Sequence, residues 1–310
     1  MTNNLLNPKV TVLMSTYNGE KYLREQLDSL LRQEGVQMKI VIRDDGSKDG
    51  TIGILQEYCD KYGCISYYTG RNLGPAGSFF DLIRKERGAD YYALCDQDDV
   101  WDPDKLKAAV RKLSVYDSAV PLLYYSNLKI VDQDLNFCRL SHSKMRGHKN
   151  KYCALTEGFM TGCTGVFNEA LAGILRDHIP EKCSMHDTWI YMTAAFFGKT
   201  VYDFYPHIMY RQHAGNVIGV HTSRFNWKGV INRLKRLFNR DLQPKYRNAV
   251  AFLDVYSDML NEKDRAVVSE MAHYKDSLKD WMKLLFGTRI HTTSPEREMR
   301  YRGLIMLRII

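Results

Sequence analysis

Three apolar segments near the N-terminus each end in polar or acidic side chains. They are VTVLMSTYN (10–18), MKIVIRDD (38–45) and YYALCDQDD (91–99). Apolar residues recur with helical spacing between them, at 19–33, at 49–62 and near 79–87. Strands that alternate with helices in this way predict an α/β fold with a mainly parallel sheet and helices on both faces.

The polar ends of these segments predict a ligand site. In open α/β sheets ligands bind at the carboxyl ends of the strands, where the connecting loops converge. Asp44-Asp45 follows the second segment and Asp96-Gln97-Asp98-Asp99 the third. Two acidic clusters in one cleft repel each other unless a cation or hydrogen-bond donors compensate them. The pattern therefore favours a bound metal.

Each acidic cluster also has a structural explanation. DDGSKDGT is compatible with a turn followed by a helix cap, which we weigh as equal to a binding role. Asp102 and Asp104 flank Pro103 at the predicted start of a helix, where acids are favoured by the helix dipole. Carboxylates two residues apart, as at Asp96 and Asp98, can instead chelate a hard ion such as Mg²⁺ or Mn²⁺.

Composition sets the class of protein. The chain has 310 residues, 45% of them apolar, enough for one large domain or one domain and an appendage. Its seven cysteines contain no CxxC pair, so we expect small core residues in a reducing compartment. We find no signal-peptide pattern and no apolar run near 18 residues, and expect a cytoplasmic protein.

Charge divides the chain near His221. Residues 1–221 carry 26 Lys or Arg and 26 Asp or Glu, whereas residues 222–310 carry 18 and 10. The strand and helix alternation also gives way there to helical patterns alone. We therefore expect an α/β domain at 1–221 and a basic helical region at 222–310.

Four motifs in this order, TYNGEKYL, IRDDGSKDGT, RNLGPAGSF and CDQDDVWDPDKL, closely resemble the family 2 glycosyltransferases. The resemblance implies a GT-A fold, a nucleotide-sugar donor and a divalent metal, Mg²⁺ or Mn²⁺, on its diphosphate. It also implies that residues 1–221 are the catalytic domain, with a nucleotide-sugar half at about 8–117 and an acceptor half at about 118–221. It implies that Asp44 or Asp45 accepts a hydrogen bond from the base imide and that Asp96 and Asp98 face the metal. Further donor contacts implied by position are Thr16, Tyr17, Asn18, Glu20, Arg71, Asn72 and Gln97.

The resemblance also implies a general base and a metal-side histidine. Asp187, in the pair His186-Asp187, matches the acid that takes the acceptor proton in inverting transfer, although capping a helix is an alternative. In YRQH, His213 either completes the metal shell or joins Arg211 on phosphate. Acceptor or phosphate contacts are also expected from Thr161, Gly162, His186 and Trp189.

The motifs DQDDVW and YRQHAGN are most similar to those of the rhamnosyltransferase branch of the family. The resemblance thus implies dTDP-β-L-rhamnose as donor and an α-L-rhamnoside as product, with a UDP-hexose donor as the alternative. A metal-dependent nucleotidyltransferase is disfavoured because no basic Gly-rich loop lies near the N-terminus. A binding or scaffold protein on a degenerate GT-A fold is the remaining rival.

Residues 222–310 carry no motif that we can name. Apolar residues between Phe225 and Phe238 form a stripe, and Lys or Arg fills much of the rest. This pattern fits a helix on an anionic membrane surface and, equally, a helix packed on the catalytic domain. The first would suit a lipid-linked glycan acceptor. Homo-oligomerisation through these helices is a further hypothesis, and no nucleic-acid-binding motif is present.

Overall fold

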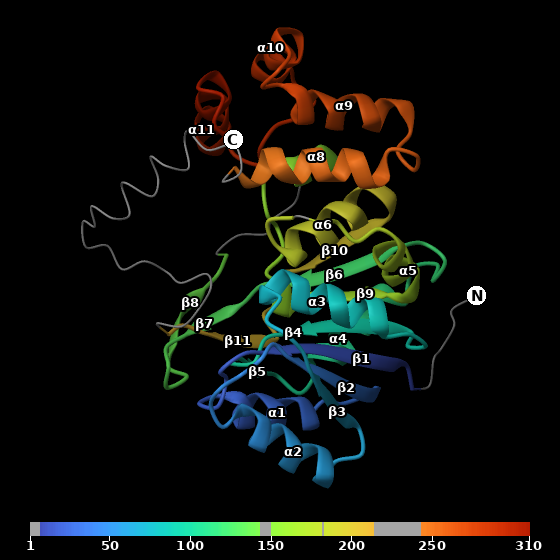
Figure 1. Cartoon of the computed structure of the whole chain (residues 1–310), viewed down its shortest axis with the longest axis vertical. Helices are drawn as coiled ribbons and strands as arrows, with labels where there is room; N and C mark the ends of the chain where they lie inside the picture. Colours follow the sequence, from blue (N-terminus) through green and yellow to red (C-terminus); the bar gives the residue numbers. More distant parts are fainter. Residues whose placement is uncertain (1–6, 143–149, 182, 214–242) are drawn as a thin grey trace. The chain divides into compact units, whose positions relative to one another are not determined.

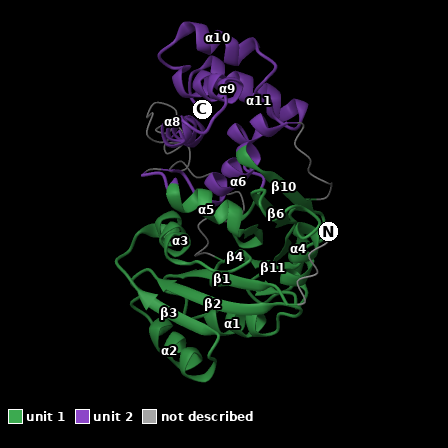
Figure 2. Ribbon diagram, turned by 90° about the vertical axis from the view of Figure 1, so that its right-hand side faces the viewer, with its two compact units in different colours: residues 1–146, 160–177, 197–219 green, residues 147–159, 178–196, 220–310 purple. Residues whose placement is uncertain are grey.

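A computed structural model describes residues 7–142, 150–181, 183–213 and 243–310. These residues form two compact units (Figure 2). Unit 1 consists of residues 1–146, 160–177 and 197–219, and unit 2 of residues 147–159, 178–196 and 220–310. The predicted boundary near His221 and the predicted stripe from Phe225 to Phe238 lie outside the described residues.

Unit 1 is built on a seven-stranded sheet with the order β10-β6-β9-β4-β1-β2-β3. Only β9 runs antiparallel to its neighbours β4 and β6, so the sheet is mainly parallel, as predicted. The strands are β1 (Lys9–Thr16), β2 (Gln37–Asp44), β3 (Ile65–Thr69), β4 (Tyr91–Cys95), β6 (Leu122–Ser126), β9 (Val166–Asn168) and β10 (Lys199–Asp203).

Helices cover both faces of this sheet. Val10, Val12 and Met14 alternate along β1 and pack in one buried cluster with α1 (Leu23–Leu31), α2 (Thr51–Lys61) and α4 (Lys105–Leu113). The helices α3 (Gly74–Lys85) and α5 (Glu169–Asp177) also contact the sheet, α3 at β1 and β2 and α5 at β4, β6 and β9, and they lie side by side (Figure 1). Burial of this apolar surface on both faces is the main force that holds the layers together.

A second, four-stranded sheet has the order β5-β11-β7-β8. Its strands are β5 (Val100–Trp101), β11 (Ile208–Arg211), β7 (Lys129–Val131) and β8 (Phe137–Leu140). The segment 201–210, which reads as one strand-like run in the sequence, divides between β10 of the large sheet and β11 of the small one. This division places Arg211 beside the loop that follows β4, because β11 pairs with β5.

Helix α3 begins at Gly74, five residues before the predicted start. The backbone N–H groups of Leu73 and Gly74 each donate to the Asp45 carboxylate at 2.8 Å. A distant carboxylate thus satisfies amides that would otherwise be unpaired at the helix start. Sequence spacing cannot show a cap that comes from another loop.

Unit 2 is helical where the structure describes it. It contains η1 (Lys151–Leu155), α8 (Pro244–Tyr256), α9 (Glu262–His273), α10 (Leu278–Phe286), α11 (Pro295–Met306) and most of α6 (His186–Phe197). The ring of Trp189 on α6 packs on Phe252 and Tyr256 of α8, with centroids 5.5 and 5.6 Å apart. The helical C-terminal region is as predicted, and the final RGLIMLRII belongs mostly to α11. Among the described helices, none is both long and apolar enough to cross a membrane.

Candidate active site

The polar ends of β1, β2 and β4 meet at one edge of the sheet because these strands are neighbours. The Gln97 side chain holds the loop after β1, since its Oε1 accepts from the Tyr17 N–H at 2.8 Å and its Nε2 donates to the Tyr17 carbonyl at 3.1 Å. Thr16 Oγ1 donates to Asp44 Oδ1 at 3.1 Å. The convergence predicted from the sequence is therefore present.

Asp44 is buried and has donors on both carboxylate oxygens. Oδ2 accepts from the N–H groups of Gly46 and Ser47, at 3.0 and 2.9 Å, and Oδ1 accepts from the hydroxyls of Ser47 and Thr16. A carboxylate has about four lone-pair sites. Asp44 is thus fully used in holding its own turn.

Asp45 is also buried, but it keeps one acceptor site. Its Oδ1 accepts from Arg43 Nη1 and from the Leu73 N–H, and its Oδ2 accepts from the Gly74 N–H. The Arg43 guanidinium also reaches Asp81 at 3.0 Å and the Arg71 carbonyl at 2.9 Å. Of the two adjacent acids, Asp45 is the one with a lone pair left for a ligand.

The other predicted donor residues line the surrounding loops. Asn18, at a positive φ of 50°, accepts from the Lys48 N–H, and Glu20 accepts from the Gly50 N–H, both at 2.8 Å. Asn72 Oδ1 accepts from the Gly74 N–H at 3.1 Å, while the Arg71 side chain is exposed. Side chains from the first loop thus fix the backbone of the DDGS loop.

Asp98 faces His213, and these are two of the three residues predicted for the metal, the third being Asp96. Their Oδ2 and Nε2 atoms are 2.7 Å apart, and the imidazole also lies on the Tyr22 ring at 4.9 Å between centroids. Arg211 is buried, donates to the Asp98 carbonyl at 2.9 Å and to the Glu25 carboxylate, and covers Tyr22. Its guanidinium supports the loop that carries His213.

A buried group lies behind this pair. Ligand atoms of Asp96, Asp99 and Cys163 lie within 4.8 Å of one another. Asp99 Oδ1 accepts from the Arg211 N–H at 3.2 Å, whereas Oδ2 is buried with no hydrogen-bond partner among the described residues. Burial, and then the charges of Asp98 and Asp96, raise the pKa of Asp99 well above its ordinary value.

Lys105 is the cation associated with this cluster. It is fully buried, its Nζ lies 3.3 Å from the centroid of the Trp101 ring, and no hydrogen-bond partner is found for it within the described chain. Burial lowers the pKa of Lys105 to about 8, while Asp99 and Asp96 act in the opposite direction. Lys105 therefore places a positive charge beside the acidic cluster without occupying a carboxylate lone pair among the described residues.

The residues present fit a divalent cation. The group combines carboxylates with one imidazole and contains a buried carboxylate oxygen for which no donor is found among the described residues. Oxygen and imidazole ligands suit Mn²⁺, and oxygen ligands alone suit Mg²⁺. A cation held here would neutralise charge on a diphosphate leaving group.

The predicted acceptor-side residues divide between the two units. Thr161 and Gly162 in unit 1 begin the short helix η2 (Gly162–Thr164), which carries Cys163 to Asp99. In unit 2, His186 and Asp187 begin α6, and Trp189 is fully buried in the core of α6 and α8. A fully buried Trp189 contributes packing there rather than a ligand surface.

Asp187 Oδ1 accepts from the N–H of Thr188 at 2.6 Å and from its hydroxyl at 3.3 Å. No bond to Oδ2 is found in the part of the chain described. The bond to the adjacent N–H is not the usual cap bond, which reaches the second or third helical amide. Burial lowers the pKa of His186, although Asp187 opposes this.

Several residues of the site were not predicted. Arg43 and Ser47 hold the first acidic pair, and Lys105 and Cys163 lie behind the second cluster. Lys105 has a weak sequence signal, because it occupies a buried position on a helix that begins beside an acidic run. Arg43 and Ser47 lie two and three residues from the acids that they contact, within the motif IRDDGS. Cys163 has no sequence signal, because Asp99 is distant in the sequence.

Comparison with known proteins agrees with this geometry. The family model of Glycosyl transferase family 2 matches residues 11–174. A dTDP-rhamnosyl transferase, RfbG of Shigella flexneri, is 32% identical over 245 residues, which cover 73% of this chain and 80% of that protein. An uncharacterized glycosyltransferase of Rickettsia typhi is 28% identical over 55% of this chain and 57% of its own length. The chain belongs to glycosyl transferase family 2.

Solved structures show the same fold. TarS (residues 1–349) of S. aureus, in complex with UDP-GlcNAc, has a TM-score of 0.59 at 17% identity, covering 97% of this chain and 82% of that one. GalNAc-T7 with UDP, GalNAc and Mn²⁺ has a TM-score of 0.53 at 12% identity, covering 87% and 55%. At such identities the likeness establishes the GT-A fold, as predicted.

Proposed function

We propose that this glycosyltransferase transfers L-rhamnose, with inversion, from dTDP-β-L-rhamnose to a hydroxyl of a glycan. The observation that carries the proposal is the Asp98–His213 pair, together with the group of Asp96, Asp99 and Cys163, beside the loops that follow β1 and β2. The rhamnose assignment rests on the similarity to the dTDP-rhamnosyl transferase RfbG. A glycan acceptor, lipid-linked or on the cell surface, and a location at the inner face of the membrane are parts of the same proposal.

Asp45 is our candidate for the base imide. Thymine and uracil donate one N3–H, which needs an acceptor with a lone pair to spare. Asp45 keeps one such site, whereas all four of Asp44 are in use. Asp44 then serves by holding the turn that presents Asp45. Arg71 and Asn72, in the loop that bonds to Arg43 and to Gly74, are proposed donor contacts.

A divalent ion, Mg²⁺ or Mn²⁺, would be held by Asp98 and His213 with Asp96 nearby, and would supply the positive charge that the departing diphosphate needs. Arg211 positions His213 through Asp98 and Tyr22, and we assign it to that role rather than to phosphate. Its guanidinium is already bonded to Glu25 and to two carbonyls.

Asp187 is our candidate for the general base. A sugar hydroxyl is a poor nucleophile until a carboxylate accepts its proton as the new bond forms. Asp187 uses one oxygen for Thr188 and keeps the other for this transfer. Burial keeps His186 neutral, so it does not compete as a second charge. Attack on the face opposite the nucleotide inverts the anomeric carbon.

Calorimetric titration with dTDP, dTDP-rhamnose, UDP and a UDP-hexose, each with and without Mn²⁺, tests the donor. We expect tight binding of dTDP-rhamnose only with metal. Preference for the UDP-hexose would remove the rhamnose assignment, and metal-independent or absent binding would favour a scaffold role.

A second experiment tests the general base. Asp187→Asn should keep donor binding, and its rate of sugar transfer should fall by roughly a hundredfold or more. Asp60→Asn, on the exposed face of α2, is the matched control.

A further inference from the structure

Helix α10 exposes three large apolar side chains on one face. Leu278, Met282 and Phe286 follow one another at four-residue spacing, and 62%, 49% and 73% of their surfaces are exposed. Of this helix only Leu284 is buried. A surface helix ordinarily turns its apolar stripe toward the core. The stripe of α10 has no such cover among the described residues.

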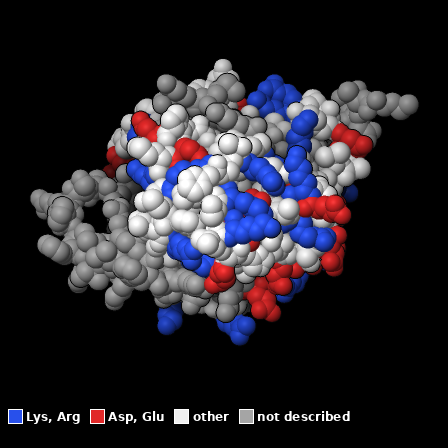
Figure 3. Space-filling view, turned by 90° about the horizontal axis from the view of Figure 1, so that it is seen from above, with Lys and Arg blue, Asp and Glu red and all other residues white. Residues whose placement is uncertain are grey.

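Positive charge borders this stripe. Lys279 and Lys283 each follow an apolar residue of the stripe and are exposed, and the Arg308 guanidinium lies 5.3 Å from the Trp281 ring. Figure 3 looks down on the side where Figure 1 labels α10, and Lys and Arg side chains gather on the face it presents. The bordering acid Asp280 lies 3.4 Å from Lys283.

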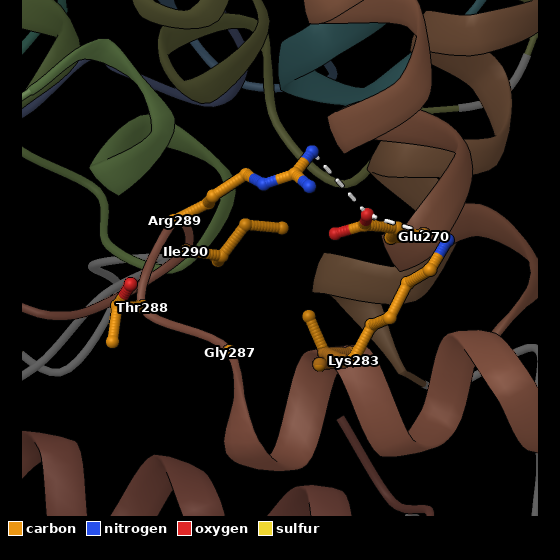
Figure 4. Close-up of a pocket in the computed structure, with 7 residues that line it drawn as sticks. Glu270, Lys283, Gly287, Thr288, Arg289 and Ile290 are labelled. Carbon is orange, nitrogen blue, oxygen red and sulfur yellow. Dashed lines mark ion pairs between the residues drawn. The ribbon is translucent and has the colours of Figure 1, made fainter.

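A small hollow of about 210 Å³ beside α10 is lined by Glu270, Lys283 and Arg289 among others. Lys283 and Arg289 approach the Glu270 carboxylate across it, at 3.7 and 3.6 Å (Figure 4). Glu270 is buried, and its charge partly offsets theirs. For Lys279 and Arg308 no acidic partner is found among the described residues, so these are the cations that an outside anion would meet.

The geometry points to an anionic phospholipid bilayer as the partner of α10. We propose that Leu278, Met282 and Phe286 enter the interface between headgroups and acyl chains, while Lys279 and Arg308 contact the headgroup phosphates. Amphipathic helices with this arrangement of apolar and basic residues bind in the plane of the interface. The proposal goes beyond sugar transfer and does not depend on which sugar is transferred.

A second copy of the chain fits this surface less well. Stable dimers bury about 800 Å² on each partner, more than the exposed face of a nine-residue helix provides. A twofold contact through the stripe would also bring the lysine rows of two copies close together, and like charges repel. A bilayer needs neither a large flat interface nor a complementary charge pattern beyond its anionic headgroups.

Vesicle flotation tests the proposal. Wild-type protein should float with vesicles of equal parts phosphatidylcholine and phosphatidylglycerol, bind phosphatidylcholine vesicles poorly, and lose binding as salt is raised. The triple variant Leu278→Ser, Met282→Ser, Phe286→Ser should bind at least about tenfold more weakly. The matched control Val115→Ser, Phe137→Ser, Tyr205→Ser removes equally exposed apolar side chains from unit 1 and should bind like wild type.

Two results would overturn the proposal: wild-type protein that does not float, or a triple variant that floats as well as wild type. Light scattering after gel filtration tests the alternative. If wild-type protein is a dimer that does not bind vesicles, and the triple variant is a monomer, the stripe contacts a second copy of the chain. Donor titration on the same samples keeps the two proposals apart. Donor binding without vesicle binding would refute only the proposed membrane contact of α10. Vesicle binding without the expected donor binding would refute only the donor assignment.

Discussion

The two acidic clusters of unit 1 have the same appearance in the sequence and different surroundings in the structure. Asp44 and Asp45 accept hydrogen bonds from four backbone amides, two hydroxyls and a guanidinium. Asp98 has His213 as its side-chain partner, and Asp99 has a buried oxygen with no donor among the described residues. The first cluster mainly organises the protein, and the second is left to be completed by a ligand.

The buried cations differ in the same way. The Arg43 guanidinium donates directly to Asp45 and Asp81, and these charged hydrogen bonds fix two loops. Lys105 lies on Trp101 and acts on the carboxylates of the second cluster through its field alone. A cation that balances charge without occupying lone pairs leaves those lone pairs to a metal. Three substitutions sharpen this contrast, and a fourth tests a neighbouring acid pair.

Asp98→Asn should have the largest effect on binding. It removes a charge and a metal-ligand oxygen, so metal-dependent binding of dTDP should weaken by roughly a hundredfold or more. The unfolding free energy should change by no more than about 1 kcal/mol, because the Asp98 side chain accepts no backbone amide among the described residues. Calorimetry and chemical denaturation measure the two quantities. A large loss of stability would place Asp98 with the structural acids.

Asp44→Ala should show the opposite pattern. It leaves the amides of Gly46 and Ser47 and two hydroxyls without their acceptor, which should cost about 3 kcal/mol of unfolding free energy. Urea denaturation measures this loss, and Asp60→Asn on exposed α2 is the control. If stability is unchanged and donor binding alone is lost, Asp44 contacts the donor and our assignment to Asp45 fails.

The sequence could predict the sheet because apolar runs and helical spacing are local signals. It could also predict which strand ends carry acids, and the motif resemblance supplied His213 and Asp98 as neighbours. It could not show which acids are saturated. Three of the four hydrogen bonds to Asp44 come from the nearby Gly46 and Ser47, but the fourth comes from Thr16. The donors to Asp45 include Leu73 and Gly74, 28 and 29 residues away, and Lys105 looks like any helical lysine. The number of acceptor sites left on each acid thus depends partly on tertiary contacts, which spacing does not encode.

Lys105→Met should produce an intermediate effect. Removing the buried charge leaves the carboxylates of Asp96, Asp98 and Asp99 without their internal cation, so affinity for Mn²⁺ should rise about tenfold. The metal-free variant should melt at a lower temperature than wild type, and Mn²⁺ should narrow the gap. Lys107→Met, on the exposed side of the same helix, controls for surface charge. If Lys105→Met lowers stability but leaves the affinity for Mn²⁺ unchanged, Lys105 contributes packing and does not affect metal binding.

We expect the smallest effect from His207→Gln. This substitution tests whether Asp104, which follows Pro103, is an acid that stabilises the fold. The His207 imidazole lies 3.0 Å from Asp104 and 3.6 Å from Asp203, and hydrogen bonding to Asp203, then to Asp104, raises the pKa of His207 despite burial.

A histidine whose pKa is raised in the folded state contributes stability that is complete below its unfolded pKa of about 6.5 and is lost as pH rises through the folded value. The unfolding free energy of wild type minus that of His207→Gln should therefore fall, by about 1 kcal/mol or less, as pH rises above 6.5. Taking the difference cancels the titration of groups whose surroundings the substitution leaves unchanged. Burial raises the pKa of Asp203, but hydrogen bonds from His207, Tyr205 and Lys112 lower it to about 2, so Asp203 stays ionised over the measured range. A difference that stays constant from pH 6 to 9 would show that folding does not raise the pKa of His207, and would contradict a stabilising charge on His207 beside Asp104 and Asp203.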